Sequence, residues 1–489
     1  MLVLRLRRTW LALALLGFGA CAAAPALAQA EASGAKARLL VLTDIEADPD
    51  DTQSLIRLLL YANEIDLEGL VATTSVHQKA RIAPESIRRV IAEYSRVRDN
   101  LALHDPDYPT ASSLQRLVAN GQPSYGMAAI GPGKDSAGSK RIIAALEAQD
   151  ARPLWVAGWG GPNTLAQALL TIRATRSPRE AKRLIAKLRV YTISDQDDTG
   201  PWIRKEFPDL FYVVSPGGYG AATWTGINAV IEGVDNESIS NGWLTRHIQQ
   251  GHGPFGAAYP DVAYGMEGDT PTFLGLIPNG LNVPERPDWG GWGGRYALRL
   301  PDHNSLDPKG FTGGVPVPVE TRAFWTNAID TFTPRIARSH GQATGPAGRS
   351  FTGFRETLWR WRDDFQNDFA ARIGWTTLSV ADANHAPIVR LDHADRLTVR
   401  SGDAVPLSAL GTTDPDGDNL SYYWFQYPEA GTYPDAIKMW GAENLYARGF
   451  IAPKVDSASE AHFIVRVTDK GTPALSRYRR VVVTIFPKG

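Results

Sequence analysis

The 489-residue sequence contains a single cysteine, Cys21, so it offers no pair for a disulfide within the chain. Its 51 lysines and arginines are balanced by 52 aspartates and glutamates, which leaves no excess of positive charge for a nucleic acid polymer. Beyond the amino-terminal segment, no apolar run is long enough to span a bilayer. Stability must therefore come from packed cores or a bound metal, and we expect no polyanionic partner.

The first residues have the parts of a secretion signal: a basic start, a short apolar run and "ALA" ahead of Gln29. We therefore expect a signal peptide over residues 1–28, cleaved after Ala28. Cys21 lies inside this segment, and lipid attachment at Cys21 is the alternative to full release. Either route places the mature protein in the periplasm or outside the cell.

Strand-like and helix-like runs alternate from residue 38 onward. Strand patterns at 38–43 and 67–74 enclose a helical pattern at 50–64, which together make one βαβ unit. This rhythm predicts an α/β domain over residues 36–380, with a mainly parallel sheet flanked by helices. Further strands are expected at 153–157, 188–194 and 210–215.

The texture of the sequence changes after "ADANHAP" at 381–387. Short alternating strands separated by turn signals then predict an all-β, immunoglobulin-like sandwich over 385–489 that folds as a separate domain. The run "DPDGDNLSYYWF" at 414–425 begins like a calcium loop, but Phe425 stands where an EF-hand needs glutamate. We expect an acidic turn there, with a weak calcium contact as the alternative.

Five carboxylates crowd the turn that follows the first strand, in "LLVLTDIEADPDD". Like charges this close raise one another's pKa unless solvent or a cation compensates them. One interpretation is a solvated turn in which Asp50 caps the next helix, and the other is a site for calcium, which prefers carboxylate oxygens. The carboxyl edge of an open α/β sheet is also where ligands bind. The five residues are Asp44, Glu46, Asp48, Asp50 and Asp51.

The stretch "TDIEADPDD" resembles the amino-terminal signature of the inosine-uridine nucleoside hydrolase fold, an Asp-x-Asp-x-Gly-x-Asp-Asp turn. The resemblance implies that Glu46 and Asp51 bind calcium, with Asp44 beside them. It also implies that Glu46 is the general base for water and that Asp50 holds a sugar hydroxyl. Two departures stand out: Glu46 is longer than the family's aspartate, and Asp48 replaces its glycine.

Other positions follow from the same resemblance. Gln78, at the end of "VATTSVHQ", matches a sugar-binding asparagine. In "VAGWGGPNTLAQAL", the carbonyl of Gly160 matches a calcium ligand, and we place Asn163 of the same turn with the substrate. Asp269 in "MEGDTPTF" matches the last calcium ligand. The histidine that neighbours this aspartate in the family is missing, so protonation of the leaving group has no assigned residue.

The whole mature chain resembles still more closely a secreted bacterial family described as nucleoside-hydrolase-like and associated with cellulose binding. Members of this family add a C-terminal immunoglobulin-like module to the α/β domain. The resemblance implies a carbohydrate ligand and does not fix a reaction. It is carried by "VYTISDQDDTGPWI" (190–203), "IPNGLNVPERPDWGGWGGRY" (277–296) and "NHAPIVRL" (384–391).

Several further residues are candidates for substrate contact. Asp195 is either part of an Asp/Gly turn or a sugar ligand. Trp159 and Trp202 lie in predicted loops, where tryptophans either pack into the core or stack on sugar rings. His252 could protonate a leaving group, although a lone histidine is more often structural. The loop tryptophans as a group are Trp159, Trp202, Trp224, Trp289 and Trp292.

We therefore expect a secreted, calcium-dependent hydrolase of glycosidic bonds. Its substrate is expected to be a glycan rather than a free nucleoside, because Glu46 and Asp48 depart from the nucleosidase pattern and the added sandwich suits a polymer. The first alternative is a non-catalytic carbohydrate-binding or cellulose-binding protein on a nucleoside hydrolase scaffold. A second is an envelope adhesion protein that binds through its sandwich domain.

Overall fold

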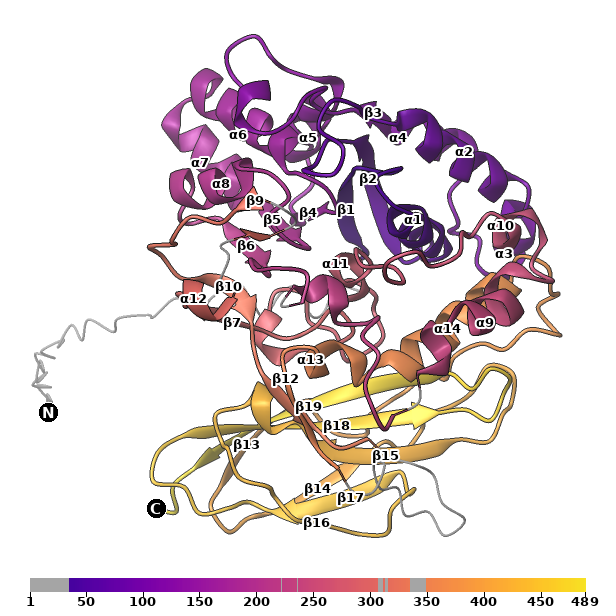
Figure 1. Cartoon of the computed structure of the whole chain (residues 1–489). Helices are drawn as coiled ribbons and strands as arrows, with labels where there is room; N and C mark the ends of the chain where they lie inside the picture. Colours follow the sequence, from indigo (N-terminus) through magenta and orange to yellow (C-terminus); the bar gives the residue numbers. More distant parts are fainter. Residues whose placement is uncertain (1–34, 221, 235, 307–310, 313–314, 335–348) are drawn as a thin grey trace, which may run out of the picture. The chain divides into compact units, whose positions relative to one another are not determined.

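The computed structural model describes residues 35–220, 222–234, 236–306, 311–312, 315–334 and 349–489 (Figure 1). The expected signal peptide over 1–28 and its Cys21 lie outside the described residues, so cleavage and lipid attachment stay predictions. Within the described residues, no helix combines the length and the apolar character needed to cross a membrane.

An eight-stranded sheet forms the centre of the first part of the chain (Figure 1). Its strands are β1 (Ala37–Thr43), β2 (Ile65–Ala72), β3 (Val118–Asn120), β4 (Leu154–Gly158), β5 (Leu188–Thr192), β6 (Phe211–Val214), β7 (Tyr296–Arg299) and β10 (Phe324–Asn327). They follow the order β3-β2-β1-β4-β5-β6-β10-β7, and all neighbours are parallel except β10 and β7. The prediction of a mainly parallel sheet is confirmed.

Helices cover both faces of this sheet because the side chains of each strand alternate between two hydrophobic cores. Leu39 and Val41 of β1 pack in one core with α1, α2 and α14, whereas Leu40 and Leu42 pack in the other with α5 to α8. The helices are α1 (Asp50–Leu60), α2 (Pro84–Ser95), α3 (Arg98–His104), α4 (Ala111–Leu117), α5 (Ala137–Glu147), α6 (Asn163–Thr175), α7 (Pro178–Ala186), α8 (Thr199–Glu206), α9 (Asn241–Leu244), α10 (Gly253–Ala257), α11 (Pro271–Leu274), α12 (His303–Leu306), α13 (Glu356–Trp359) and α14 (Arg362–Gly374).

The C-terminal part is all-β, as predicted. One sheet has the order β13-β19-β18-β15 and the other β14-β17-β16, and their facing side chains form a separate core around Phe450 and Phe463. The immunoglobulin-like assignment and the boundary at residue 385 stay predictions. The strands are β13 (Arg396–Arg400), β14 (Ala404–Ser408), β15 (Ser421–Gln426), β16 (Met439–Trp440), β17 (Ala447–Ile451), β18 (Ser459–Thr468) and β19 (Ser476–Phe486). Short strands elsewhere are β8 (Phe311–Thr312), β9 (Val315–Pro316), β11 (Asp330–Phe332) and β12 (Phe351–Gly353).

Buried contacts join the two parts of the chain. Tyr478 of β19 belongs to the same hydrophobic core as Trp292 and Phe365. The hydroxyls of Tyr478 and Ser476 donate hydrogen bonds to the carboxylate of Asp364 in α14. The C-terminal strands therefore bury part of their own surface against the α/β domain.

Candidate functional site

The acidic turn lies between β1 and α1, at the carboxyl edge of the parallel sheet. The hydroxyl of Thr43, the last residue of β1, donates to the carboxylate of Asp51 and accepts the backbone N–H of Ile45 at 3.1 Å. Asp48 Oδ1 accepts the backbone N–H of Asp50 at 2.9 Å, which closes the entry to α1. These bonds hold the carboxylates of the turn in place before any ligand binds.

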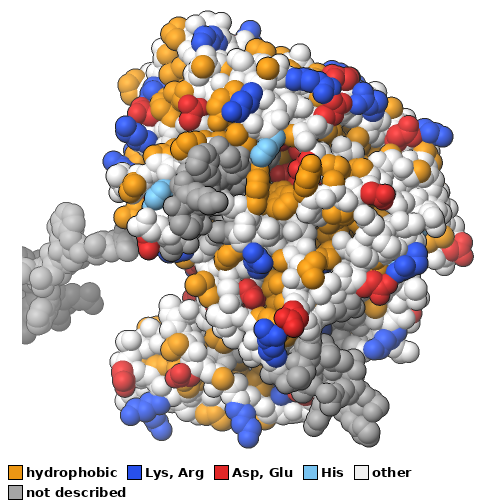
Figure 2. Space-filling view, in the orientation of Figure 1, with side chains coloured by type: hydrophobic (Ala, Val, Ile, Leu, Met, Phe, Trp, Pro, Cys, Tyr) orange, Lys and Arg blue, Asp and Glu red, His pale blue; other side chains and the backbone are white. Residues whose placement is uncertain are grey.

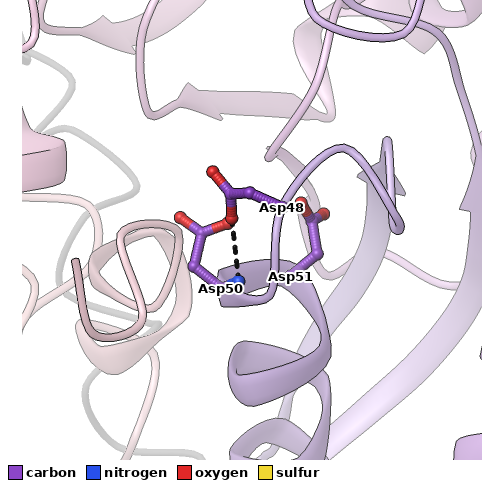
Figure 3. A group of neighbouring side chains, drawn as sticks. All are labelled: Asp48, Asp50 and Asp51. Atoms are coloured by element: carbon purple, nitrogen blue, oxygen red, sulfur yellow. Dashed lines mark hydrogen bonds between the residues drawn. The ribbon is translucent and has the colours of Figure 1, made fainter. Parts of the chain in front are cut away.

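Three carboxylates of the turn converge. One oxygen each from Asp48, Asp50 and Asp51 lies within 4.8 Å of the other two (Figure 3). Asp50 and Asp51 are buried in the first turn of α1, whereas Asp48 is half-buried and so remains reachable from solvent. In the space-filling view, acidic atoms are visible in a hollow bordered by apolar side chains and a histidine (Figure 2).

Two further carboxylates adjoin this cluster. Asp44 packs against Gly160, where an added Cβ would lie 2.8 Å from Asp44 Oδ1, so only glycine fits at position 160 without displacing the acid. Asp269, which precedes α11, is buried, and the charges of Asp50 and Asp51 act on its carboxyl. The structure thus brings together acids that are more than 200 residues apart in the chain.

Burial and mutual repulsion disfavour the ionised form of these acids. Burial raises the pKa of Asp44 to about 7. Burial, with the charges of neighbouring aspartates, also raises the pKa of Asp50, Asp51 and Asp269 well above the ordinary value. Within the described residues, no lysine or arginine forms an ion pair with Asp44, Asp48, Asp50, Asp51 or Asp269. The cluster therefore lacks a protein cation that would balance its charge.

Glu46 does not join the cluster, which differs from the expectation that it binds calcium and activates water. Its carboxylate accepts hydrogen bonds from Ser86, from Arg81 and, at 2.8 Å, from Arg89, all on or just before α2. The Ser86 hydroxyl, with Arg89 and Arg81, holds the pKa of Glu46 below its ordinary value. Glu46 also has φ = 85°, so the left-handed position of the turn is residue 46 rather than Asp48.

Gln78 and Asn163 lie beside the acidic turn but are engaged by the protein. The Gln78 amide donates to the carbonyls of Asp44 and Ile45, each at 3.3 Å. Asn163 is buried, and its amide donates to Thr74 Oγ1 at 3.0 Å while its oxygen accepts from Thr73 at 3.1 Å. Both residues therefore shape the loops around the cluster, and substrate contact by either of them stays a prediction.

Asp195 and Trp159 have structural partners. The carboxylate of Asp195 makes a buried two-point ion pair with Arg204 at 2.8 and 2.7 Å, which differs from the expected sugar contact. Trp159 is fully buried and donates its indole N–H to Thr272 Oγ1 at 2.8 Å, so its ring has no exposed face for a sugar. Core packing, the alternative for the loop tryptophans, applies to Trp159.

Trp202 and His252 also have structural surroundings. Trp202 packs edge-on to Phe207, with the Arg173 guanidinium 5.7 Å from its ring centre. The carbonyl of His252 accepts a hydrogen bond from Thr376 at 3.0 Å, so this residue contacts the segment after α14 rather than the acid cluster. The roles expected for Trp202 in sugar stacking and for His252 in proton donation have no support from these contacts.

Three aromatic residues lie at the edge of the cluster, of which Trp224 was weighed for sugar stacking as a loop tryptophan, whereas Tyr219 and His77 were not assigned roles from the sequence. Trp224 donates its indole N–H to Asp50 Oδ2 at 2.6 Å, and its ring centre lies 5.2 Å from that of Tyr219. The hydroxyl of Tyr219 is hydrogen-bonded to Nε2 of His77. The charges of Asp44 and Asp50 contribute to a raised pKa of Tyr219, after burial as the main cause. The signal in the sequence was weak, because these residues come from two separate loops.

Two matches with known proteins bear on this site. Residues 38–296 match the family described as "Cellulose-binding Sde182, nucleoside hydrolase-like domain", which is more than half of the chain. The chain belongs to this family. Residues 404–485 match "Cellulose-binding protein Sde0182, C-terminal domain", so both parts of the chain have the organisation of the Sde182 family.

The chain is also similar to a solved structure, described as a nucleoside hydrolase-related hypothetical protein from Saccharophagus degradans that is associated with carbohydrate metabolism. The two share 33% identity over 92% of this chain and 100% of that chain, with a TM-score of 0.76. No curated protein matches the chain. The resemblance to the nucleoside-hydrolase-like family and the expected α/β fold are thereby confirmed.

The acid cluster of this Sde182 family member fits a divalent cation on chemical grounds. Its donors are carboxylates, the hard oxygen ligands that calcium prefers. Three of them already lie within reach of one ion, and the cluster has no balancing arginine or lysine among the described residues. An ion bound there would remove the repulsion that raises the pKa of these acids.

Removal of bound cations is expected to make the stability of this Sde182 family protein fall as the pH rises. In the folded state the pKa of Asp44 is about 7, above its ordinary value of 3.8, so folding takes up protons between these pH values. The stabilisation is complete below about pH 4 and is lost progressively as the pH rises through 7. Urea unfolding in EDTA at pH 5 and pH 8 measures the loss.

Asp44→Asn is the matched variant for this measurement. Its side chain does not titrate, so the loss between pH 5 and pH 8 should shrink. A loss of equal size in the wild type and in Asp44→Asn would contradict the assignment to this carboxyl.

Proposed function

We propose that this protein is a secreted, calcium-dependent hydrolase that cleaves a glycosidic bond in a glycan. The observation that carries the proposal is the convergence of Asp48, Asp50 and Asp51 within 4.8 Å at the carboxyl edge of the sheet, with no compensating protein cation among the described residues. A buried acid cluster at this edge is costly for folding, so it needs a functional reason.

Calcium would be held by the carboxylates of Asp48, Asp50 and Asp51, with Asp44, Asp269 and the Gly160 carbonyl beside them. A bound divalent cation lowers the pKa of water and draws in sugar hydroxyls as ligands. Glu46 is not included, because its carboxylate is engaged by Ser86, Arg81 and Arg89.

The chain's own residues supply the remaining steps. We assign the general base to Asp48, because it is the most accessible carboxylate of the three and therefore the one that water reaches first. Asp50, which accepts the Trp224 indole N–H, orients a sugar hydroxyl from the buried side. The negative cluster as a whole stabilises the positive charge that develops on the sugar ring as the glycosidic bond breaks.

The hydrogen-bonded pair His77 and Tyr219 is our candidate for protonation of the leaving group. His77 is exposed and Tyr219 adjoins Trp224, so the pair lies at the open edge of the cluster. A proton held between Nε2 of His77 and the Tyr219 hydroxyl can pass to a departing oxygen that enters from solvent. The pair thereby takes the place of the family histidine that the sequence lacks.

Neutral glycan is the proposed substrate class, and the extracellular space the proposed location. Both matched families are described as cellulose-binding, and the similar solved structure as associated with carbohydrate metabolism. A nucleoside is less favoured, because the turn departs from the nucleoside hydrolase pattern at Glu46 and Asp48.

Calorimetric titration of chelator-stripped protein with calcium tests the metal site. Asp51→Asn removes a buried ligand and is expected to weaken binding at least ~100-fold. Glu46→Gln is the matched control, because the partners of Glu46 lie on or just before α2 and outside the acid cluster, and it should bind calcium like the wild type. Equal binding by the wild type and Asp51→Asn, or loss of binding in Glu46→Gln, would contradict the proposed ligand set.

The second candidate function is carbohydrate binding without catalysis. It is favoured by the descriptions of the two matched families, which state cellulose binding and no reaction. A screen of the wild type with calcium against cello-oligosaccharides, aryl glycosides and nucleosides separates the two. Release of free sugar supports the hydrolase, whereas sugar binding without any turnover supports the binder.

A further inference from the structure

The strands of the sheet β14-β17-β16 (Figure 1) place no charged side chain on its outer face, because Arg448 pairs with the buried Leu407 and so lies on the inner face. Antiparallel pairing places Pro406, Gly449 and Trp440 in one row across the three strands, since Pro406 pairs with Gly449 and Gly449 with Trp440. The neighbouring row on β14 and β17 is Ala404 and Ile451, and both are exposed. Side chains that pair in register share a face, so these residues form one neutral, mostly apolar surface.

Trp440 lies flat on this face because Gly449 has no side chain. An added Cβ at Gly449 would overlap atoms of the Trp440 indole, so the ring rests directly on the backbone of β17. One face of the indole is covered in this way, yet Trp440 remains 42% exposed. A tryptophan held in a fixed orientation with an open face is unusual for a solvent-exposed strand and suits a planar ligand.

A groove of about 390 Å³ runs beside the indole, lined among others by Trp440, Ile451, Tyr433 and Lys438. Its size is within the range of ~300–1,000 Å³ that small-molecule sites occupy. The segment that forms one wall is fixed, because Gln426 bonds the backbone of Ile437 at 2.7 Å and of Asp435 at 3.0 Å. The groove is therefore a formed feature of the C-terminal sheet.

We propose that this face and groove bind a chain of β-linked glucose units, with one sugar ring stacked on Trp440. The apolar C–H face of such a sugar matches the indole, and the uncharged outer face of the strands matches an uncharged polymer, with Lys438 the one charged residue in the groove lining. An extended, ribbon-like glucan can continue from the Trp440 ring along the apolar row to Ile451. The inference rests on the proposed glycan ligand and adds a second binding surface, separate from the acid cluster.

Binding of the full chain to cellohexaose and to microcrystalline cellulose tests the proposal. The assay is run in EDTA, so that the acid cluster contributes no calcium-dependent binding. Trp440→Ala should raise the apparent Kd at least ~10-fold. Trp440→Phe keeps an aromatic ring, so its apparent Kd should lie between those of the wild type and Trp440→Ala. Phe486→Ala is the matched control, because Phe486 is an aromatic residue with 40% exposure on the other sheet. The Phe486→Ala protein should bind both glucans with the affinity of the wild type.

The possible outcomes separate this inference from the proposed function. If the wild type and a folded Trp440→Ala protein bind the glucans equally well, the assignment of this face is wrong, while the proposal of a glycan ligand still stands. No binding of either glucan by the wild type in EDTA would overturn this inference but not the proposed function, whose calcium-dependent site is silent under these conditions. Concentration-dependent self-association that Trp440→Ala abolishes, in the absence of glucan binding, would instead assign the face to a second copy of the chain.

Discussion

Turnover by the Asp48→Asn protein is expected to fall ~10²–10⁴-fold, the usual cost of removing a general base. Asparagine keeps the shape of the side chain and can still accept the Asp50 backbone N–H at Asp48 Oδ1, so the turn should remain intact. It cannot accept a proton from water. The measurement is kcat on the best substrate of the screen, at saturating calcium.

Glu46→Gln is the matched control for this prediction, because it makes the same chemical change two positions earlier in the same turn. It removes ion pairs with Arg81 and Arg89, whose side chains are 57% and 67% exposed, and such pairs contribute only ~0.2–1 kcal/mol. Turnover should therefore stay within a few-fold of the wild type. The reverse pattern, with activity lost in Glu46→Gln and kept in Asp48→Asn, would restore Glu46 as the base.

The fold could be predicted because it depends on local pattern. The five expected strands are short apolar runs, and β1, β2, β4, β5 and β6 lie within two residues of them, whereas β3, β7 and β10 were not predicted. The position of the acid cluster also follows from sequence, because Asp44, Asp48, Asp50 and Asp51 come directly after the first strand. A residue at the end of a parallel strand must lie at the carboxyl edge of the sheet.

The direction of individual side chains could not be predicted, because it depends on partners from other elements. Glu46 turns away from the other acids of the turn because its backbone is left-handed and because Arg89 and Ser86 of α2 donate hydrogen bonds to its carboxylate. Asp195 looks like a ligand in an acidic turn, yet Arg204 of α8 neutralises it. Nothing in the spacing of these residues distinguishes an ion pair from a binding site.

The burial of individual tryptophans could not be predicted from the sequence either. Trp159 and Trp440 both stand in segments with turn signals, but Trp159 is fully buried and donates to Thr272, whereas Trp440 is 42% exposed. What separates them is the neighbouring structure: a packed core in one case, and the bare backbone of Gly449 on an outer face in the other. Burial is a property of the assembled fold, so the sequence analysis left packing and sugar stacking open for Trp159 and did not single out Trp440.

The free energy of unfolding of Glu267→Ala is expected to be lower than that of the wild type by ~3–5 kcal/mol, because the variant leaves a buried charge without its partner. Glu267 and Arg57 are both fully buried, and their charged atoms are 2.5 Å apart. Glu267 also accepts hydrogen bonds from Tyr259 at 2.6 Å and Thr270 at 2.9 Å. These bonds fix the turn that carries Asp269 against α1. Urea unfolding at constant pH measures the difference.

Glu237→Ala is the matched control, because Glu237 and its partner Arg246 are 60% and 54% exposed, and the loss should be at most ~1 kcal/mol. A second measurement tests whether the buried ion pair of Glu267 and Arg57 supports the cation site. Calcium at ~100 times its Kd should stabilise the wild type by ~2.7 kcal/mol. In Glu267→Ala the increment should shrink, because Asp269 is no longer held beside Asp50 and Asp51. If Glu267→Ala loses no more stability than Glu237→Ala, or keeps the full calcium increment, then the buried pair does not position the Asp269 ligand.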